Sequence, residues 1–215
     1  YATSEAGGAF FLIDDIKVTE GYTLKAPAQA TDLTVKAGDN GALNATVSFT
    51  APEQAVDGSM LTSLSSVTVS RGGQVVKTFD SPEPGEPLTF NESDLPTGMA
   101  TYEVVGINEY GQGPTATGEA WIGIDYPTAP THVKVSLNAD GHPVITWQAP
   151  EDPGVYGGYV GDELTYSVYK TKTGTWVKTD IDGYSCVDES VTTDNTGDQS
   201  LLEYAVFAES AQGLG

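Results

Sequence analysis

The chain repeats itself at an interval of about one small domain. The run "TYEVVGINEYGQG" (101–113) returns as "EYAVFAESAQGLG" (203–215), with a tyrosine, a valine and a glycine at matching points. Two further pairs of segments match at nearly the same interval: "VSFTAP" (47–52) with "ITWQAP" (145–150), and "DLTV" (32–35) with "HVKV" (132–135). An interval of about 100 residues is the size of one immunoglobulin-like β-sandwich. The sequence therefore predicts two similar domains in tandem.

Within each repeat the residue pattern favours strands. Apolar and polar residues alternate in short runs rich in valine, threonine and aromatic residues, as expected for half-buried strands. These runs are "DLTVKA" (32–37), "NATVSF" (44–49), "SVTVS" (66–70), "TYEVVGI" (101–107) and "AWIGI" (120–124). Turn sequences separate them: "GDNG" (38–41), "RGG" (71–73), "SPEPGEP" (81–87) and "LPTG" (95–98). Short strands at this spacing predict an all-β protein made of β-sandwiches.

Two features resemble fibronectin type III modules, and the resemblance covers nearly all of residues 27–215. The family's second strand carries a core tryptophan, which corresponds to Trp147 here and to Phe49 in the first repeat. The family's corner motif, a leucine and a proline or glycine ahead of a tyrosine and an alternating strand, is matched by "LPTGMATYEVVGINEYGQG" (95–113). The resemblance implies that the rings of Tyr102 and Tyr204 fill the two cores while their hydroxyls bond backbone upstream.

The repeat and the resemblance divide the chain into three parts. We expect a terminal strand and linker at 1–26, a first module at 27–125 and an incomplete second module at 126–215. "GIDYPTAP" (123–130) joins the modules, and its two prolines favour an extended linker of limited flexibility, with Trp121 and Tyr126 available for a small interface. Because Tyr1 is not a natural start, we expect a piece of a longer protein.

Other parts of the sequence resemble secreted multidomain proteins of gut bacteria. The loop sequence "APEDPGVYGGYVGDELTYSVYK" (149–170) is similar to the corresponding loop in their modules. "GGAFFLIDDIKVTEG" (7–21) is similar to the last strand of a preceding jelly-roll or lectin-like domain. The resemblance implies an extracellular or cell-surface location and neighbouring domains in the same polypeptide as partners.

Two segments are expected to lack a partner strand. The second repeat has no counterpart of "ATGEAWIGI" (116–124), which leaves the strand at 203–208 as an open edge. "AFFLIDDIKV" (9–18) is a strand without a sheet of its own. One hypothesis is that residues 9–18 add to the open edge of a second copy by strand exchange. The alternative, which we favour, is packing against the side of the first module or a contact between molecules.

Composition excludes several functions. Thirty acidic residues against nine basic ones give a net charge of −21, which repels nucleic-acid backbones and anionic membrane surfaces. No apolar run is long enough to insert into a membrane, the longest being "AFFLI" (9–13). One cysteine, Cys186, allows no disulfide within the chain, and alternation predicts that its thiol is buried in the core.

No catalytic, cofactor-binding or metal-binding set is predicted. His132 and His142 have no partner at metal-ligand spacing, and a solvated turn is the favoured interpretation of His142. "DIDG" (180–183) has only the start of a calcium loop. The acids of "DESVTTDNTGD" (188–198) are compatible with weak calcium binding, although an acidic loop without metal is favoured.

Three tyrosines in predicted loops are the candidate contacts with a ligand or partner. These are Tyr110, Tyr156 and Tyr159, the last two within "VYGGY" (155–159). Their rings suit stacking on sugars or anchoring of a protein, although rings that close the end of a module or the joint are favoured for Tyr156 and Tyr159. The sequence thus predicts non-enzymatic spacer or interaction modules, with a glycan- or protein-binding module as the alternative.

Overall fold

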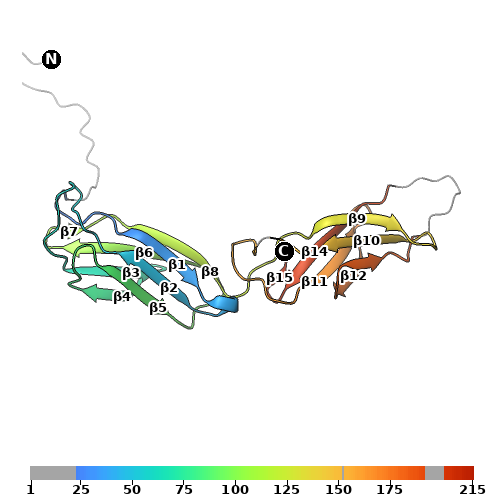
Figure 1. Cartoon of the computed structure of the whole chain (residues 1–215), viewed down its shortest axis with the longest axis horizontal. Coiled ribbons are helices and arrows are strands. Elements are labelled where there is room, and N and C mark those ends of the chain that lie inside the picture. Colours follow the sequence, from blue (N-terminus) through green and yellow to red (C-terminus); the bar gives the residue numbers. More distant parts are fainter. Residues whose placement is uncertain (1–22, 152, 192–200) are drawn as a thin grey trace, which may run out of the picture.

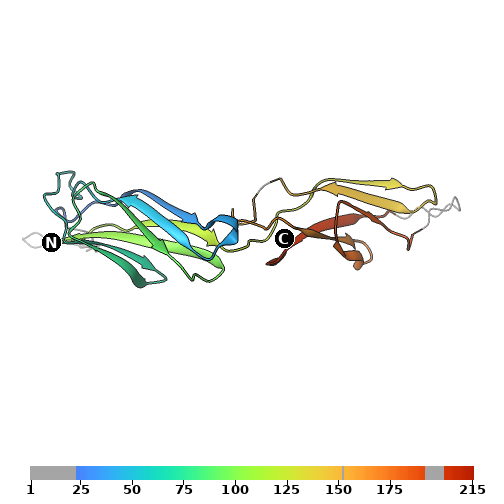
Figure 2. The ribbon, with the colours of Figure 1, turned by 60° about the horizontal axis from the view of Figure 1, so that its bottom comes forward.

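The computed structural model describes residues 23–151, 153–191 and 201–215. Two β-sandwiches lie end to end and give the molecule an elongated shape (Figures 1 and 2). Strands β1 to β8 form the first sandwich, module 1, and strands β9 to β15 form the second, module 2. The prediction of an all-β chain with two tandem immunoglobulin-like sandwiches is confirmed.

Module 1 has one sheet of three strands and one of five strands. The first sheet runs in the order β1 (Thr31–Ala37), β2 (Ala45–Thr50), β5 (Pro87–Glu92). The second runs β4 (Gln74–Asp80), β3 (Ser66–Arg71), β6 (Gly98–Asn108), with β7 (Gly111–Gln112) and β8 (Ala116–Ile122) both on the far edge of β6. A short 3₁₀ turn, η1 (Asp39–Gly41), follows β1. All strand pairs are antiparallel.

Module 2 repeats this plan, with shorter counterparts of β5 and β6. Its first sheet runs β9 (Thr131–Leu137), β10 (Pro143–Gln148), β13 (Ser185–Val187). Its second runs β12 (Thr175–Ile181), β11 (Thr165–Lys170), β14 (Tyr204–Ser210), β15 (Gly213–Leu214). Backbone detail repeats as well, since Asp32 and His132 both adopt a left-handed φ of 52° in the first strand of their module.

Strict alternation places the two cores between the sheets. Along β2 the side chains of Ala45, Val47 and Phe49 are buried while their neighbours in the strand lie partly exposed. In module 2 Trp147 takes the place of Phe49 and is 4 % exposed, as the resemblance implied. Cys186 also lies in this core, so its predicted burial is confirmed.

The two modules differ at the edge where β8 lies. In module 1, β8 pairs with β6 and packs on β1, where Leu33 and Val35 would contact any Cβ added at Gly118. In module 2 the corresponding apolar residues of β9 are exposed: Val133, Val135 and Leu137. Among the residues that the structure describes, no strand borders β14 in the place of β8. Residues 9–18, which we considered for this edge, lie outside the described residues.

The second glycine of each repeated "GxG" has a steric role. Gly113 donates its N–H to the carbonyl of Gly106 at 2.9 Å, and Gly215 donates to that of Ala208 at 3.0 Å. A Cβ on Gly113 would collide with the carbonyl oxygen of Pro27, and one on Gly215 with that of Pro127. Both glycines therefore allow the strand end to approach the entering chain closely, and "GQG" is a corner of the fold.

We predict that Gly113→Ala lowers the free energy of unfolding by about 3 kcal/mol, because the added methyl group forces the backbone of Pro27 to move. Urea denaturation measures the change. The matched control is Gly72→Ala in the β3–β4 turn, where the added Cβ meets no atom and the cost of about 1 kcal/mol comes only from the left-handed φ of 57°. Equal losses in the two variants would contradict the steric role.

Candidate functional site

The joint between the modules is organised by one buried carboxylate. Asp125, in the linker, is fully buried although it carries a charged group. Its Oδ1 accepts the N–H of Tyr126 at 2.7 Å, and its Oδ2 accepts the N–H groups of Tyr156 at 2.8 Å and Gly158 at 3.0 Å. Three backbone donors satisfy the carboxylate and tie the linker to the loop 153–161 between β10 and β11.

The backbone of Asp125 adds two more bonds to module 2. Its N–H donates to the carbonyl of Tyr159 at 2.7 Å, and its own carbonyl accepts the hydroxyl of Ser210 at 2.8 Å. Ile124 and Tyr159 also form a parallel β-bridge. Residues 124–126 of the linker therefore have backbone polar groups paired on both sides of Asp125, which limits how far this part of the linker can bend.

Two glycines allow the loop to close over the linker. A Cβ on Gly154 would collide with the Asp125 carboxylate, and one on Gly158 would lie 2.6 Å from Cδ1 of Trp121. Gly157 lies between them with a left-handed φ of 81°. The glycines of "VYGGY" are thus required by the turn and by the close approach of Asp125 and Trp121.

Aromatic rings close the outside of the joint. Trp121, near the end of β8, stacks on Tyr156 with ring centroids 4.6 Å apart and planes inclined by 6°. Tyr126 meets the same tryptophan edge to face at 6.2 Å. The indole Nε1 donates to the carbonyl of Ile124 at 3.0 Å, which fixes the ring beside the linker. An offset or edge-to-face arrangement of this kind adds about 1 kcal/mol per pair to the area buried.

The structure brings two of the three candidate tyrosines together. Tyr156 and Tyr159 both lie in the joint: Tyr159 packs near Gly41 of module 1, and a hydrogen bond to Asp162 raises the pKa of its hydroxyl. Tyr110 is in the β6–β7 turn at the opposite end of module 1, where its side chain is 54 % exposed. Sequence reasoning proposed Trp121 and Tyr126 for an interface but missed Asp125, whose only signal was an acidic residue in an otherwise apolar linker.

We predict that Asp125→Ala lowers the free energy of unfolding of module 2 by about 3 kcal/mol, because it leaves three buried N–H groups without an acceptor. Differential scanning calorimetry of the whole chain measures the change. Asp140→Ala, at an exposed turn position, is the control and should change stability by less than about 0.5 kcal/mol. Equal effects of the two substitutions would contradict this account of the joint.

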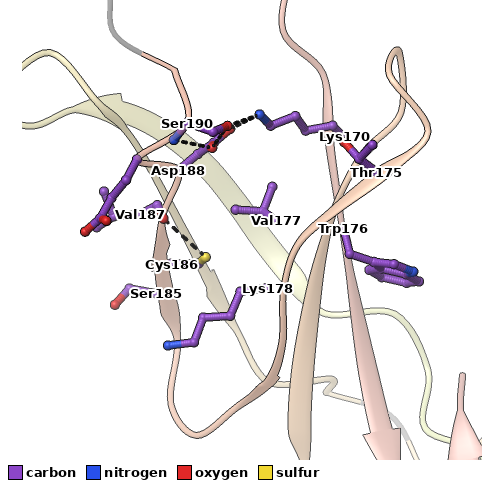
Figure 3. A pocket seen from close by; sticks show the side chains of 11 residues that line it. Lys170, Thr175, Trp176, Val177, Lys178, Ser185, Cys186, Val187, Asp188 and Ser190 are labelled. Carbon is purple, nitrogen blue, oxygen red and sulfur yellow. Dashed lines mark hydrogen bonds and ion pairs between the residues drawn. The ribbon is translucent and has the colours of Figure 1, made fainter.

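Module 2 also has a groove of about 610 Å³ on the side where its two sheets open (Figure 3). β12 supplies one wall, with Trp176 and Lys178, and β13 supplies the other, with Cys186. Asp188 closes one end, where its carboxylate pairs with the ammonium of Lys170 at 2.7 Å. The groove is therefore lined by both polar and apolar side chains, and its buried acid, Asp188, is already paired with a cation.

Asp188 has no free capacity for catalysis or metal binding. Its Oδ2 also accepts the hydroxyl of Tyr204 at 2.9 Å, and its Oδ1 accepts the hydroxyl of Ser190 at 2.6 Å. Burial alone would raise the pKa of Asp188, but the bonds from Lys170, Ser190 and Tyr204 outweigh it and lower that pKa. The carboxyl thus stays ionised at neutral pH as a structural anion.

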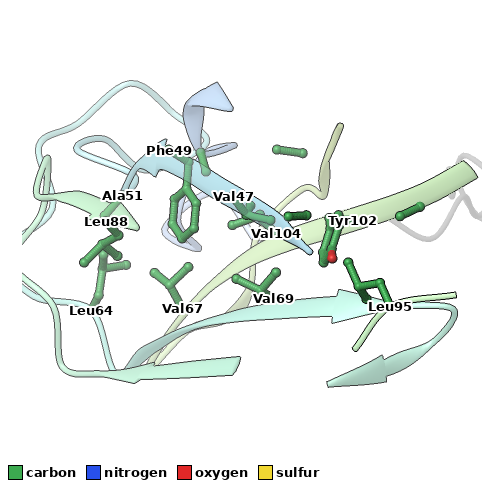
Figure 4. Packing of buried hydrophobic residues seen from close by; sticks show 14 of the residues in the cluster. Val47, Phe49, Ala51, Leu64, Val67, Val69, Leu88, Leu95, Tyr102 and Val104 are labelled. Carbon is green, nitrogen blue, oxygen red and sulfur yellow. The ribbon is translucent and has the colours of Figure 1, made fainter. Parts of the chain in front are cut away.

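Module 1 has the same arrangement with different residues. Tyr102, fully buried in the core (Figure 4), donates its hydroxyl to the Glu92 carboxylate at 2.7 Å. Arg71 pairs with that carboxylate at 2.8 Å. The expectation that the two tyrosine hydroxyls bond upstream backbone is therefore wrong: both bond a carboxylate at the end of, or just after, the third strand of the other sheet. In each module a carboxylate, that of Glu92 or Asp188, is the acceptor in place of a backbone carbonyl.

The Cys186 thiol and the two histidines also have structural surroundings. Burial raises the pKa of Cys186, which keeps its thiol protonated at neutral pH. His142 lies in the turn between β9 and β10, as expected, but its side chain is partly buried, with Nδ1 2.8 Å from the carbonyl oxygen of Val191, so it is not fully solvated. His132 is exposed, and its Nδ1 lies 3.2 Å from the hydroxyl oxygen of Thr131.

Residues 23–151, 153–191 and 201–215 contain no group of three histidine, cysteine or acidic side chains placed to hold a metal ion. Most of the acidic loop 188–198 lies outside the described residues. Within the described ranges no helix is long and apolar enough to cross a membrane.

We predict that Glu92→Gln lowers the free energy of unfolding by about 2 kcal/mol at pH 7, because Arg71 and Tyr102 lose a charged acceptor. The bonds from Arg71 and Tyr102 outweigh burial and lower the pKa of Glu92 in the folded state. Its contribution is therefore complete above the unfolded pKa of about 4.3 and disappears as the pH falls through the folded value.

Urea denaturation between pH 7 and pH 3 tests this prediction. The difference between the unaltered protein and Glu92→Gln should shrink below about pH 4. Glu103→Gln, at an exposed position on β6, is the control for the loss of one negative charge from an acidic protein. A difference that stays constant down to pH 3 would contradict the proposed ion pair.

Comparisons with known proteins add fold neighbours of low similarity. The sequence matches no family profile and no curated protein. Among solved structures it is similar to the FN1–FN3 domains of chicken CNTN1, with 17 % identity over 92 % of this chain and 65 % of that chain and a TM-score of 0.34. The central fibronectin-III array of RIM-binding protein gives 14 % identity, 86 % and 59 % coverage, and a TM-score of 0.33. The chain spans less than two thirds of either structure.

Proposed function

We propose that the two modules act as a stiff spacer that holds neighbouring domains at a set distance. The observation that carries the proposal is the joint: Asp125 is fully buried and bonded to the loop of module 2, and Trp121 of module 1 stacks on Tyr156 of that loop. Buried polar contacts and packed rings in a linker oppose independent motion of the two domains. A flexible tether would have an exposed linker rich in glycine and serine.

The wider setting is part of the same proposal. The fibronectin type III resemblance and the loop sequence 149–170 support a secreted or cell-surface bacterial protein with further domains. A net charge of −21 suits a soluble surface module that repels other anionic surfaces. In this role the chain carries no catalysis of its own and fixes the separation of a catalytic or binding domain from its anchor.

Distances between spin labels test the stiffness. Thr78→Cys on β4 and Thr179→Cys on β12 place one label on each module at exposed positions, in a background where Cys186 is replaced by alanine. We expect one narrow distance distribution that broadens in Tyr156→Ala, because the ring that stacks on Trp121 is lost. Tyr110→Ala is the control at the other end of module 1. A broad distribution in the unaltered protein would overturn the spacer proposal.

A second function, recognition of a glycan or protein, is favoured by one observation. Tyr156 stacks on Trp121 through one face yet remains 52 % exposed, which leaves its other face open for a sugar ring or an apolar side chain. A glycan array tests this function, with loss of a signal in Tyr156→Ala and retention in Tyr110→Ala as the expected result. An array without signal would remove the glycan form of the proposal.

A further inference from the structure

The loop between β2 and β3 in module 1 has the same backbone fold as the joint loop of module 2. Three backbone hydrogen bonds correspond in the two loops. In module 1 the N–H groups of Ala55, Gly58 and Val56 donate to the carbonyls of Ser59, Ala55 and Ala26, respectively. In module 2 the N–H groups of Gly154, Gly157 and Val155 donate to the carbonyls of Gly158, Gly154 and Tyr126 in the same order. Each loop therefore presents the same surface at the end of its module where the chain enters.

In module 2 this surface is covered by the residues that immediately precede the module. Trp121 packs on Tyr156, and Ile124 bridges to Tyr159. In module 1 the corresponding region is uncovered within the described residues. Its apolar side chains are exposed to 67 % for Leu24, 39 % for Val56, 59 % for Met60 and 54 % for Tyr110. We refer to these four residues as the end surface of module 1.

A groove runs through the end surface, and the chain enters beside it. The groove has a volume of about 240 Å³ and includes Lys25, Met60 and Tyr110 in its lining. The hydroxyl of Thr23 donates to the carbonyl of Tyr110 at 2.8 Å, and the carbonyl of Leu24 accepts the N–H of Asp57 at 3.0 Å. Thr23 and Leu24 are thus held against the end surface.

We propose that the apolar segment 9–18 of the same chain docks on the end surface of module 1, as the residues before module 2 dock on its loop. The segment reads "AFFLIDDIKV" and offers Phe10, Phe11, Leu12 and Ile13 as apolar contacts. Four residues separate Val18 from Thr23, and the five steps of a fully extended chain between them span at most about 18 Å. This tether keeps the segment near the end surface at a high effective concentration.

Methionine methyl NMR tests the proposal, because the chain contains only two methionines. Met60 belongs to the end surface, and Met99 lies on β6 opposite Trp121, at the other end of module 1. With methyl-labelled methionine in the whole chain, we expect a soluble paramagnetic agent to broaden Met60 less than its exposure of 59 % implies. In Phe11→Ser/Ile13→Ser the Met60 methyl resonance should shift and broaden at least twofold more, while Met99 stays unchanged.

The control is Val75→Ser, an exposed apolar residue on the outer face of β4, which should leave both methyl resonances in place. Dilution distinguishes docking of the chain's own segment from docking of a second copy. Protection of Met60 that is independent of protein concentration supports docking within one chain. Protection that disappears on dilution would assign the surface to a second copy and overturn the proposal. Full exposure of Met60 to the agent in the unaltered protein would also overturn it.

Discussion

The arrangement of the two modules depends on the carboxylate of Asp125. A buried charge without partners would cost several kcal/mol, so its position is tolerated only because three N–H groups meet it. Those donors come from the linker and from the loop of module 2, and the glycines of that loop leave the space that the carboxylate requires. The buried carboxylate of Asp125 therefore explains both the geometry of the joint and the glycines of "VYGGY".

Another interaction, which occurs once in each module, links the two sheets of that module. Tyr102, Glu92 and Arg71 in module 1 correspond to Tyr204, Asp188 and Lys170 in module 2, although only the tyrosine is conserved between the repeats. Glutamate with arginine and aspartate with lysine preserve the charge pattern while their lengths differ. Burial together with the bond to Glu92 raises the pKa of Tyr102, so its hydroxyl remains a donor throughout the physiological range.

The sequence was sufficient to predict the two-sandwich fold because alternation and repetition are local or periodic signals. The burial of Cys186 followed from that pattern, that of Trp147 followed from the resemblance to fibronectin type III modules, and both are buried. The partner of the Tyr102 hydroxyl was missed, because it depends on which side chain crosses the gap between sheets. Asp125 was missed for a similar reason: its donors at 156 and 158 become neighbours only when the loop of module 2 folds back on the linker.

The central claim is that the joint holds the modules in one orientation. Residual dipolar couplings of backbone amides in a weakly aligned sample measure this most directly, since each module reports its own alignment tensor. The account predicts that couplings from both modules fit a single tensor with the orientation shown in Figures 1 and 2. Two tensors of clearly different magnitude for the two modules would contradict it.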